Sequence, residues 1–159
     1  MGFEDGDLRI LYIKEGSDFV PIGCLTTNSF TETVELLPTT TRESNGWKTY
    51  VPTTQDATIP FEGIQPSDST GVLSHHDLKL KKRARELVEW RIGDDTNTYV
   101  DTGFGYIIDI GEVAPAGDLI TFSGIIQNYG VPSLLIALGD LFQSGATFLL
   151  QNGQGLTFN

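Results

Sequence analysis

The sequence has few of the residues that cross-link a chain or hold a metal: one Cys and two His among 159 residues. Cys24 is alone and cannot form an intrachain disulfide, so we expect it to be a buried small hydrophobe. His75 and His76 are adjacent, and neighbours on a helix point about 100° apart, which favours two surface positions in a first helical turn over a metal-binding pair. The sequence therefore indicates neither a disulfide scaffold nor a metal cofactor.

Long apolar runs are also lacking. The longest, "SLLIALGDLF", is too short for a membrane-spanning helix and contains Asp140. The opening "MGFEDGD" has no basic stretch and no apolar stretch, so we expect neither a secretion signal nor a lipid anchor. No membrane association is predicted.

Basic residues are scarce and unevenly placed. The chain has 10 Lys and Arg against 21 Asp and Glu, a formal net charge of −11. Six of the ten basic residues lie at 79–91 with only two acidic ones, so that segment carries +4 and the remainder −15. An acidic body repels polyanions, which disfavours general nucleic-acid binding. The chain is an acidic body with one basic element.

The 18 glycines and the frequent Thr in short runs predict a mainly β fold, with strands joined by turns, in one domain spanning 1–159. Strands are expected at the ranges 8–13, 19–25, 29–37, 47–51, 57–61, 104–113 and 119–130, with turns at 14–18, 93–98 and 114–118. Three apolar runs in 133–159 are read as further short strands, and this segment has no firm placement.

Residues 29–37 alternate most cleanly, with Phe30, Val34 and Leu36 expected on a core face. The opposite, polar face holds Ser29, Thr31, Thr33 and Glu35. The following segment, 38–72, is rich in Pro and Thr and too long for an ordinary connection, which predicts a functional or binding arm in loop form.

One helix is predicted, at 74–88. Ser74 and Asp77 have capping-box spacing, and Leu80, Ala84 and Leu87 recur on one face that is expected to pack on the sheet. This arrangement directs Lys81, Lys82 and Arg85 away from the core.

No catalytic constellation stands out. The "GFGY" at 103–106 lacks the third glycine of a dinucleotide fingerprint, and "DDTNTYVD" has Val100 where a calcium loop needs Gly. The chain contains no nucleophile elbow, and Cys24 has no His nearby in sequence. We expect a protein without enzymatic activity and without a cofactor.

Several stretches in order carry a resemblance: "GCLTTNSFTETVELLPTTTRESNGWKTYVPTTQDATIPFEG", "HHDLKLKKRARELVEWRI" and "GFGYIIDIGEVAPAGDLITFSGIIQNYG". Over residues 8–132 the chain resembles the major tail tube protein of long-tailed bacteriophages. The resemblance implies a β-sandwich or barrel-like fold with one flanking helix. It also implies that six copies join edge to edge into rings that stack into a tube. The segment 133–159 has no counterpart in it.

The same resemblance implies the partners. They would be further copies of the chain, a tape measure protein, a tail terminator, and baseplate or tip proteins, with DNA passing through an acidic lumen without specific binding. The protein would be part of the virion tail and be assembled in the host bacterial cytoplasm.

Three surfaces receive roles on this basis. The arm at 38–72 would contact the adjacent ring through Trp47, Lys48 and Tyr50. The basic helix would meet acidic surface of a neighbouring subunit through Lys81, Lys82 and Arg85. The lumen would be lined by the polar strand face of Ser29, Thr31, Thr33 and Glu35.

Two other interpretations stay open. One is the tube subunit of a phage-like particle that carries no DNA. The other is a non-catalytic acidic β-sandwich binding module, such as a tail adaptor or a carbohydrate-binding domain, although the sequence shows no array of exposed aromatic residues on one sheet face.

Overall fold

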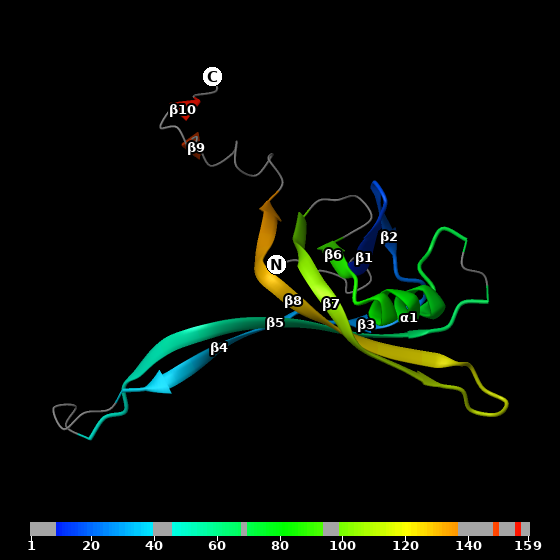
Figure 1. Cartoon of the computed structure of the whole chain (residues 1–159), viewed down its shortest axis with the longest axis horizontal. Coiled ribbons are helices and arrows are strands. Elements are labelled where there is room, and N and C mark those ends of the chain that lie inside the picture. Colours follow the sequence, from blue (N-terminus) through cyan, green and yellow to red (C-terminus); the bar gives the residue numbers. More distant parts are fainter. Residues whose placement is uncertain are drawn as a thin grey trace, which may run out of the picture.

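A computed structural model of the chain describes residues 9–39, 46–67, 70–93 and 99–136 and two short strands further on. It contains one helix and a curled eight-stranded sheet with the strand order β2-β1-β6-β7-β8-β5-β3 and with β4 beside β5 (Figure 1). The elements are β1 (Ile10–Glu15), β2 (Asp18–Pro21), β3 (Leu25–Asn28), β4 (Thr31–Pro38), β5 (Tyr50–Ile64), α1 (His75–Ala84), β6 (Leu87–Gly93), β7 (Tyr99–Val113), β8 (Thr121–Ile136), β9 (Phe148–Leu149) and β10 (Gly155–Leu156).

The predicted mainly β, barrel-like fold with one flanking helix is confirmed. The turns expected at 14–18 and 114–118 are present, while residues 94–98 and most of 137–159 lie outside the described residues. Within the described residues, no helix is long and apolar enough to span a membrane.

The core lies on one face of the sheet, under α1. Alternate residues of the central strands point into it, because successive side chains of a strand face opposite sides. Trp90 of β6 is fully buried and is flanked on its own strand by Val88 and Ile92. The other buried hydrophobic members are Leu11, Ile13, Ile22, Ile59, Phe61, Leu73, Leu78, Ile107, Phe122 and Ile126. Burying such side chains stabilises the fold by roughly 1.5–3 kcal/mol each.

Cys24 is exposed, so the prediction of a buried cysteine is wrong. The strand expected at 19–25 is interrupted: β2 ends at Pro21, and a turn through Cys24 precedes β3. Cys24 has φ 52°, a left-handed conformation that reverses the chain.

The prediction of a loop arm at 38–72, with only short strands at 47–51 and 57–61, is wrong for residues 50–64, which form the single 15-residue strand β5. Its second half buries Ala57, Ile59 and Phe61 and pairs with β8. Pro60 obscures this alternation in the sequence. It cannot donate a backbone hydrogen bond, but its carbonyl accepts one from the Ser29 N–H at 3.1 Å.

The helix begins as predicted and ends four residues early. Ser74 Oγ accepts the Asp77 N–H, and the Asp77 carboxylate accepts the Ser74 N–H, which completes the capping box. The helix stops at Ala84 because Arg85 is left-handed, with φ 53°, and β6 begins at Leu87.

Candidate functional site

The β4–β5 hairpin projects from the body of the molecule (Figure 1). Its strands pair from Thr31 with Thr58 at the base to Pro38 with Tyr50 near the tip. All of β4 and residues 50–56 of β5 are exposed, so this part of the hairpin has no core of its own. Its apolar side chains, Val34, Leu36, Leu37, Tyr50 and Val51, are 48–56% exposed. The arm predicted from the sequence is therefore a β-hairpin with an uncovered apolar surface.

The prediction that Val34 and Leu36 face the core is wrong, because both are about half exposed. The strand alternates as expected, but among the described residues nothing buries either face of it. On the polar side, Glu35 Oε2 accepts a hydrogen bond of 2.8 Å from Thr54 Oγ1. A lumen position for Ser29, Thr31, Thr33 and Glu35 stays a prediction.

Trp47 lies near the far end of the hairpin and is 79% exposed. Lys48 and Tyr50 follow it, and both are exposed. Within the described part of the hairpin, Lys48 is the one basic residue. The structure thus brings the three predicted arm residues to one exposed end, and their contact with another ring stays a prediction.

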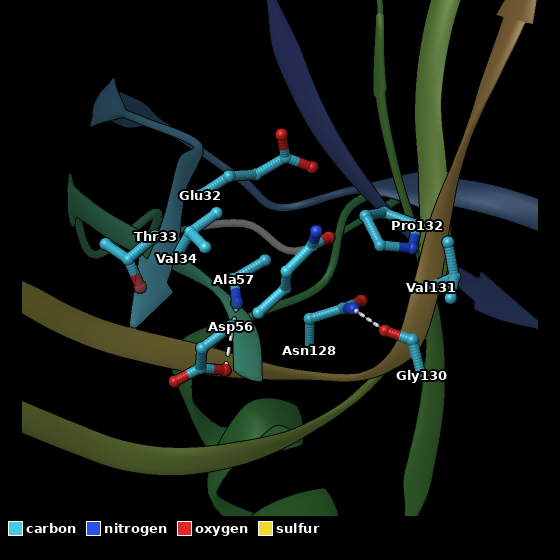
Figure 2. A pocket seen from close by; sticks show the side chains of 10 residues that line it. Glu32, Thr33, Val34, Asp56, Ala57, Asn128, Gly130, Val131 and Pro132 are labelled. Carbon is cyan, nitrogen blue, oxygen red and sulfur yellow. Dashed lines mark hydrogen bonds between the residues drawn. The ribbon is translucent and has the colours of Figure 1, made fainter. Parts of the chain in front are cut away.

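Strands β5 and β8 form a fork at the base of the hairpin. They pair from Ile64 with Thr121 to Thr58 with Gln127 and then separate, with β5 entering the hairpin and β8 bending away (Figure 1). A cavity of about 320 Å³ lies at this fork, and we call it the fork cavity (Figure 2). It is lined by Glu32, Thr33, Val34, Gln55, Asp56, Ala57, Asn128, Gly130, Val131 and Pro132.

The fork cavity combines an apolar wall with two carboxylates and contains no basic residue in its lining. Asp56 is fixed in place, since its Oδ1 accepts the Ala57 N–H at 2.9 Å and also the side-chain amide of Gln127. Asn128 Nδ2 donates to the Gly130 carbonyl at 2.8 Å (Figure 2). Val131 is 90% exposed. The site suits an apolar group that carries a positive charge.

The basic helix is tied to the sheet, contrary to part of the prediction. Lys81 Nζ lies 2.7 Å from Glu15 Oε1 and 3.0 Å from Glu86 Oε1, and its side chain is only 11% exposed. Burial opposes the charge of Lys81, but hydrogen bonds from its ammonium to Glu15 and Glu86 outweigh it and raise the pKa. Lys81 therefore does not point away from the core. An inter-subunit role for Lys82 and Arg85 stays a prediction.

The predicted apolar stripe of the helix is wrong as well. Leu80 is 51% and Leu87 41% exposed, and Ala84 is exposed. The face that packs on the sheet instead buries His75 and Leu78. Leu80 and Leu87 are left as uncovered apolar surface beside the basic residues.

His75 is buried, with 4% exposure, where the sequence predicted a surface position. Its ring lies against Phe122, and its Nε2 is 3.7 Å from Glu112 Oε2 without a hydrogen-bond partner. Burial, aided by the nearby charge of Lys79, lowers the pKa of His75 and outweighs the opposing effect of Glu112. The histidine is a neutral core residue at pH 7.

An exposed aromatic patch that the sequence analysis missed covers the opposite face of the sheet. Phe104 is 48%, Tyr106 38% and Tyr129 63% exposed, and the rings of the two tyrosines meet edge to face with centroids 6.1 Å apart. Gly103 and Gly105 alternate with Phe104 and Tyr106 and are buried on the core face. In the sequence, the alternation of glycine and aromatic residues in "GFGY" indicates a strand with glycines on one face and aromatic side chains on the other.

The described residues contain no group of three or more His, Cys, Asp or Glu side chains that could hold a metal ion. The main exposed features of the described residues are the hairpin, the fork cavity and the aromatic patch.

No protein-family model and no curated protein matches the chain. Among solved structures, it is similar to a chain in the tail of an empty gene transfer agent particle, refined with C6 symmetry, with TM-score 0.71 and 16% identity over 84% of this chain and 99% of that one. The SPP1 tail tube gives TM-score 0.66 and 12% identity, covering 94% of this chain and 92% of that one. A chain of the anti-feeding prophage baseplate, 6-fold symmetrised, gives TM-score 0.62 and 10% identity over 86% and 97%. The chain therefore has the fold of a phage tail tube protein.

Proposed function

We propose that the chain is a structural, non-enzymatic subunit of a phage tail tube, built from stacked rings of identical copies. The observation that carries this proposal is the similarity of fold along 99% of the gene transfer agent tail chain and 92% of the SPP1 tail tube chain. Ring formation by six copies is supported by the C6 symmetry of the first of these structures.

Open strand edges support side-by-side assembly. Strand β2 lies at one end of the sheet, and β3 and β4 lie at the other. Strand β8 pairs with β5 only as far as Gln127, and beyond that residue it pairs with β7 alone. Within the described residues, the edge of β8 that faced β5 is therefore open from Gln127 onwards. Unpaired edges are a liability in a monomer, and a closed ring satisfies them.

The proposed lumen is acidic and conducts DNA during ejection. The net charge of −11 supports this, because a surface that repels phosphate offers a polyanion no strong binding site. Ser29, Thr31, Thr33 and Glu35 are the candidate lumen face. Partners would be tape measure, terminator and baseplate or tip proteins in the virion tail, after assembly in the bacterial cytoplasm.

A DNA-free tube is the second candidate. It is favoured by the similarity to a chain of the anti-feeding prophage baseplate. The two candidates share the same assembly and differ in whether nucleic acid passes through the lumen.

Negative-stain electron microscopy and analytical ultracentrifugation of concentrated protein test the assembly. We expect rings or tubes of constant diameter with a central channel. A protein that stays monomeric at every concentration, also in the presence of its tape measure protein, would contradict the proposal.

A further inference from the structure

We propose that the fork cavity is the receptor for the hairpin end of a second copy, with the Trp47 indole in the cavity and the Lys48 ammonium beside Glu32. This inference rests on the proposed function, and it adds the partner site that the hairpin would occupy.

The hairpin cannot fill its own cavity. Cavity residues Thr33 and Asp56 face each other at the base of the hairpin, whereas Pro38 and Tyr50 pair five residues further along β4, about 17 Å away. The pairing continues past them, with the Thr39 N–H donating to the Thr49 carbonyl at 2.8 Å. A paired ribbon of this length cannot fold back on itself, so a hairpin end that occupies the cavity must come from another chain.

The two surfaces match in size and in chemistry. Trp47 is the most exposed large aromatic residue of the described chain. Tryptophan is enriched among the side chains that dominate interface energies, especially when it enters a pocket. The cavity of about 320 Å³ offers apolar contact from Val34, Val131 and Pro132.

The charges match as well. Glu32 and Asp56 are the acidic residues of a lining that holds no basic residue, and Glu32 lies on the same face of the hairpin as Val34. Lys48 is the basic residue next to Trp47. Among the exposed aromatic residues, Phe104, Tyr106 and Tyr129 have no Lys or Arg beside them in sequence. Trp47 with Lys48 therefore fits an acidic cavity better than the aromatic patch does.

The contact also has a geometric consequence. Tip and cavity are different surfaces of one chain, so each copy uses both and the contact is head to tail. Such a contact can repeat without closing, which is what the stacking of rings along an axis requires. The projecting hairpin provides the axial reach.

Variants of the full chain test the pairing by the protein concentration at which light scattering shows half-maximal assembly. Trp47→Ala should raise this concentration by about 30-fold, since loss of a central aromatic anchor commonly has this effect. Glu32→Lys and Lys48→Glu should each raise it by about fivefold, and the double variant should return towards the parent value. Assembly of Trp47→Ala at the parent's concentration would overturn the pairing and leave the tube proposal intact. A parent protein that never assembles would overturn both.

A cross-linking experiment tests the contact directly. In a Cys24→Ser background, chains with Lys48→Cys are mixed with chains with Val34→Cys and oxidised. We expect a disulfide-linked mixed dimer. Val113→Cys is the matched control, because Val113 is 65% exposed and lies outside the cavity. Equal cross-linking of the Val113 control, or none with Val34→Cys, would overturn the assignment.

Discussion

The indole Nε1 of Trp90 donates a hydrogen bond of 3.0 Å to Asn128 Oδ1, linking β6 to β8 across the intervening strand β7. The link passes over Gly103. A Cβ at that position would lie 2.8 Å from Asn128 Oδ1 and 2.9 Å from the Trp90 ring. Neither neighbour can move freely, because Trp90 is fully buried and Asn128 Nδ2 is bound to the Gly130 carbonyl.

Gly103→Ala is therefore expected to lower the free energy of unfolding by about 1–3 kcal/mol, the usual cost of overpacking. Urea unfolding followed by Trp fluorescence measures the loss. Gly111→Ala is the matched control, since its Cβ would meet only Ser123 Oγ, at 3.4 Å. If both variants were equally stable, Gly103 would not be a packing constraint.

The buried His75 predicts a dependence of stability on pH. Its pKa is lowered from an ordinary value of 6.5, so the unfolded chain binds a proton at a higher pH than the folded chain. Stability conferred by the neutral ring is complete well above pH 6.5 and is lost as the pH falls through that value towards the folded pKa. Lys79, Glu112 and His76 are the titratable groups that act on the ring, with His76 the weakest of the three.

His75→Phe should flatten this part of the stability profile, because it keeps a ring against Phe122 and removes the titrating group. Free energies of unfolding measured between about pH 8 and pH 5 test this. His76→Gln controls for the exposed neighbour and should keep most of the parent profile, because His76 is the weakest of the influences on the pKa of His75. A parent-like slope in His75→Phe would assign the pH dependence to other groups.

What the sequence could predict followed from local rules. The capping box of Ser74 and Asp77 depends on residues three apart, and it is present. The turn at 114–118 also depends on a short motif and is present. The mainly β fold and the single helix needed only composition and periodicity.

What it could not predict depended on distant partners. Lys81, in helix α1, forms an ion pair with Glu15 of strand β1, which is 66 positions earlier in the sequence. Leu80 and Val34 were assigned to a core from hydrophobicity and periodicity, yet both are about half exposed in the described chain. The fork cavity forms where β5 and β8 separate, a junction of segments about 70 residues apart that no local motif marks.

Lys81 is expected to stabilise the helix on the sheet. Lys81→Met keeps much of the aliphatic stem and leaves Glu15 and Glu86 without their ion pair. We expect a loss of about 1 kcal/mol in the free energy of unfolding, because both carboxylates are substantially exposed and solvent screens the pair.

The control is Lys82→Met, which removes a charge from the same helical turn and should cost roughly 0.5 kcal/mol or less. The difference between the two variants should shrink in about 1 M salt, since exposed ion pairs are screened. A Lys82 variant as unstable as the Lys81 variant would mean that general helix charge, and not the Glu15 contact, matters.

The last prediction concerns the remaining basic surface of the helix. Lys81 forms ion pairs within its own chain, so we expect Lys82 and Arg85 to make the electrostatic contact with a neighbouring subunit. The double reversal Lys82→Glu and Arg85→Glu should leave the monomer folded and raise the concentration needed for assembly by about tenfold in low salt. Each exposed pair contributes only about 0.2–1 kcal/mol, but a ring repeats the contact in every subunit.

The parent's assembly should weaken as salt is raised from about 50 to 500 mM, while assembly of the double variant should depend less on salt. Light scattering measures the assembly, and urea unfolding of the monomer is the control for folding. A variant that assembles like the parent at every salt concentration would show that this helix face is not a subunit contact.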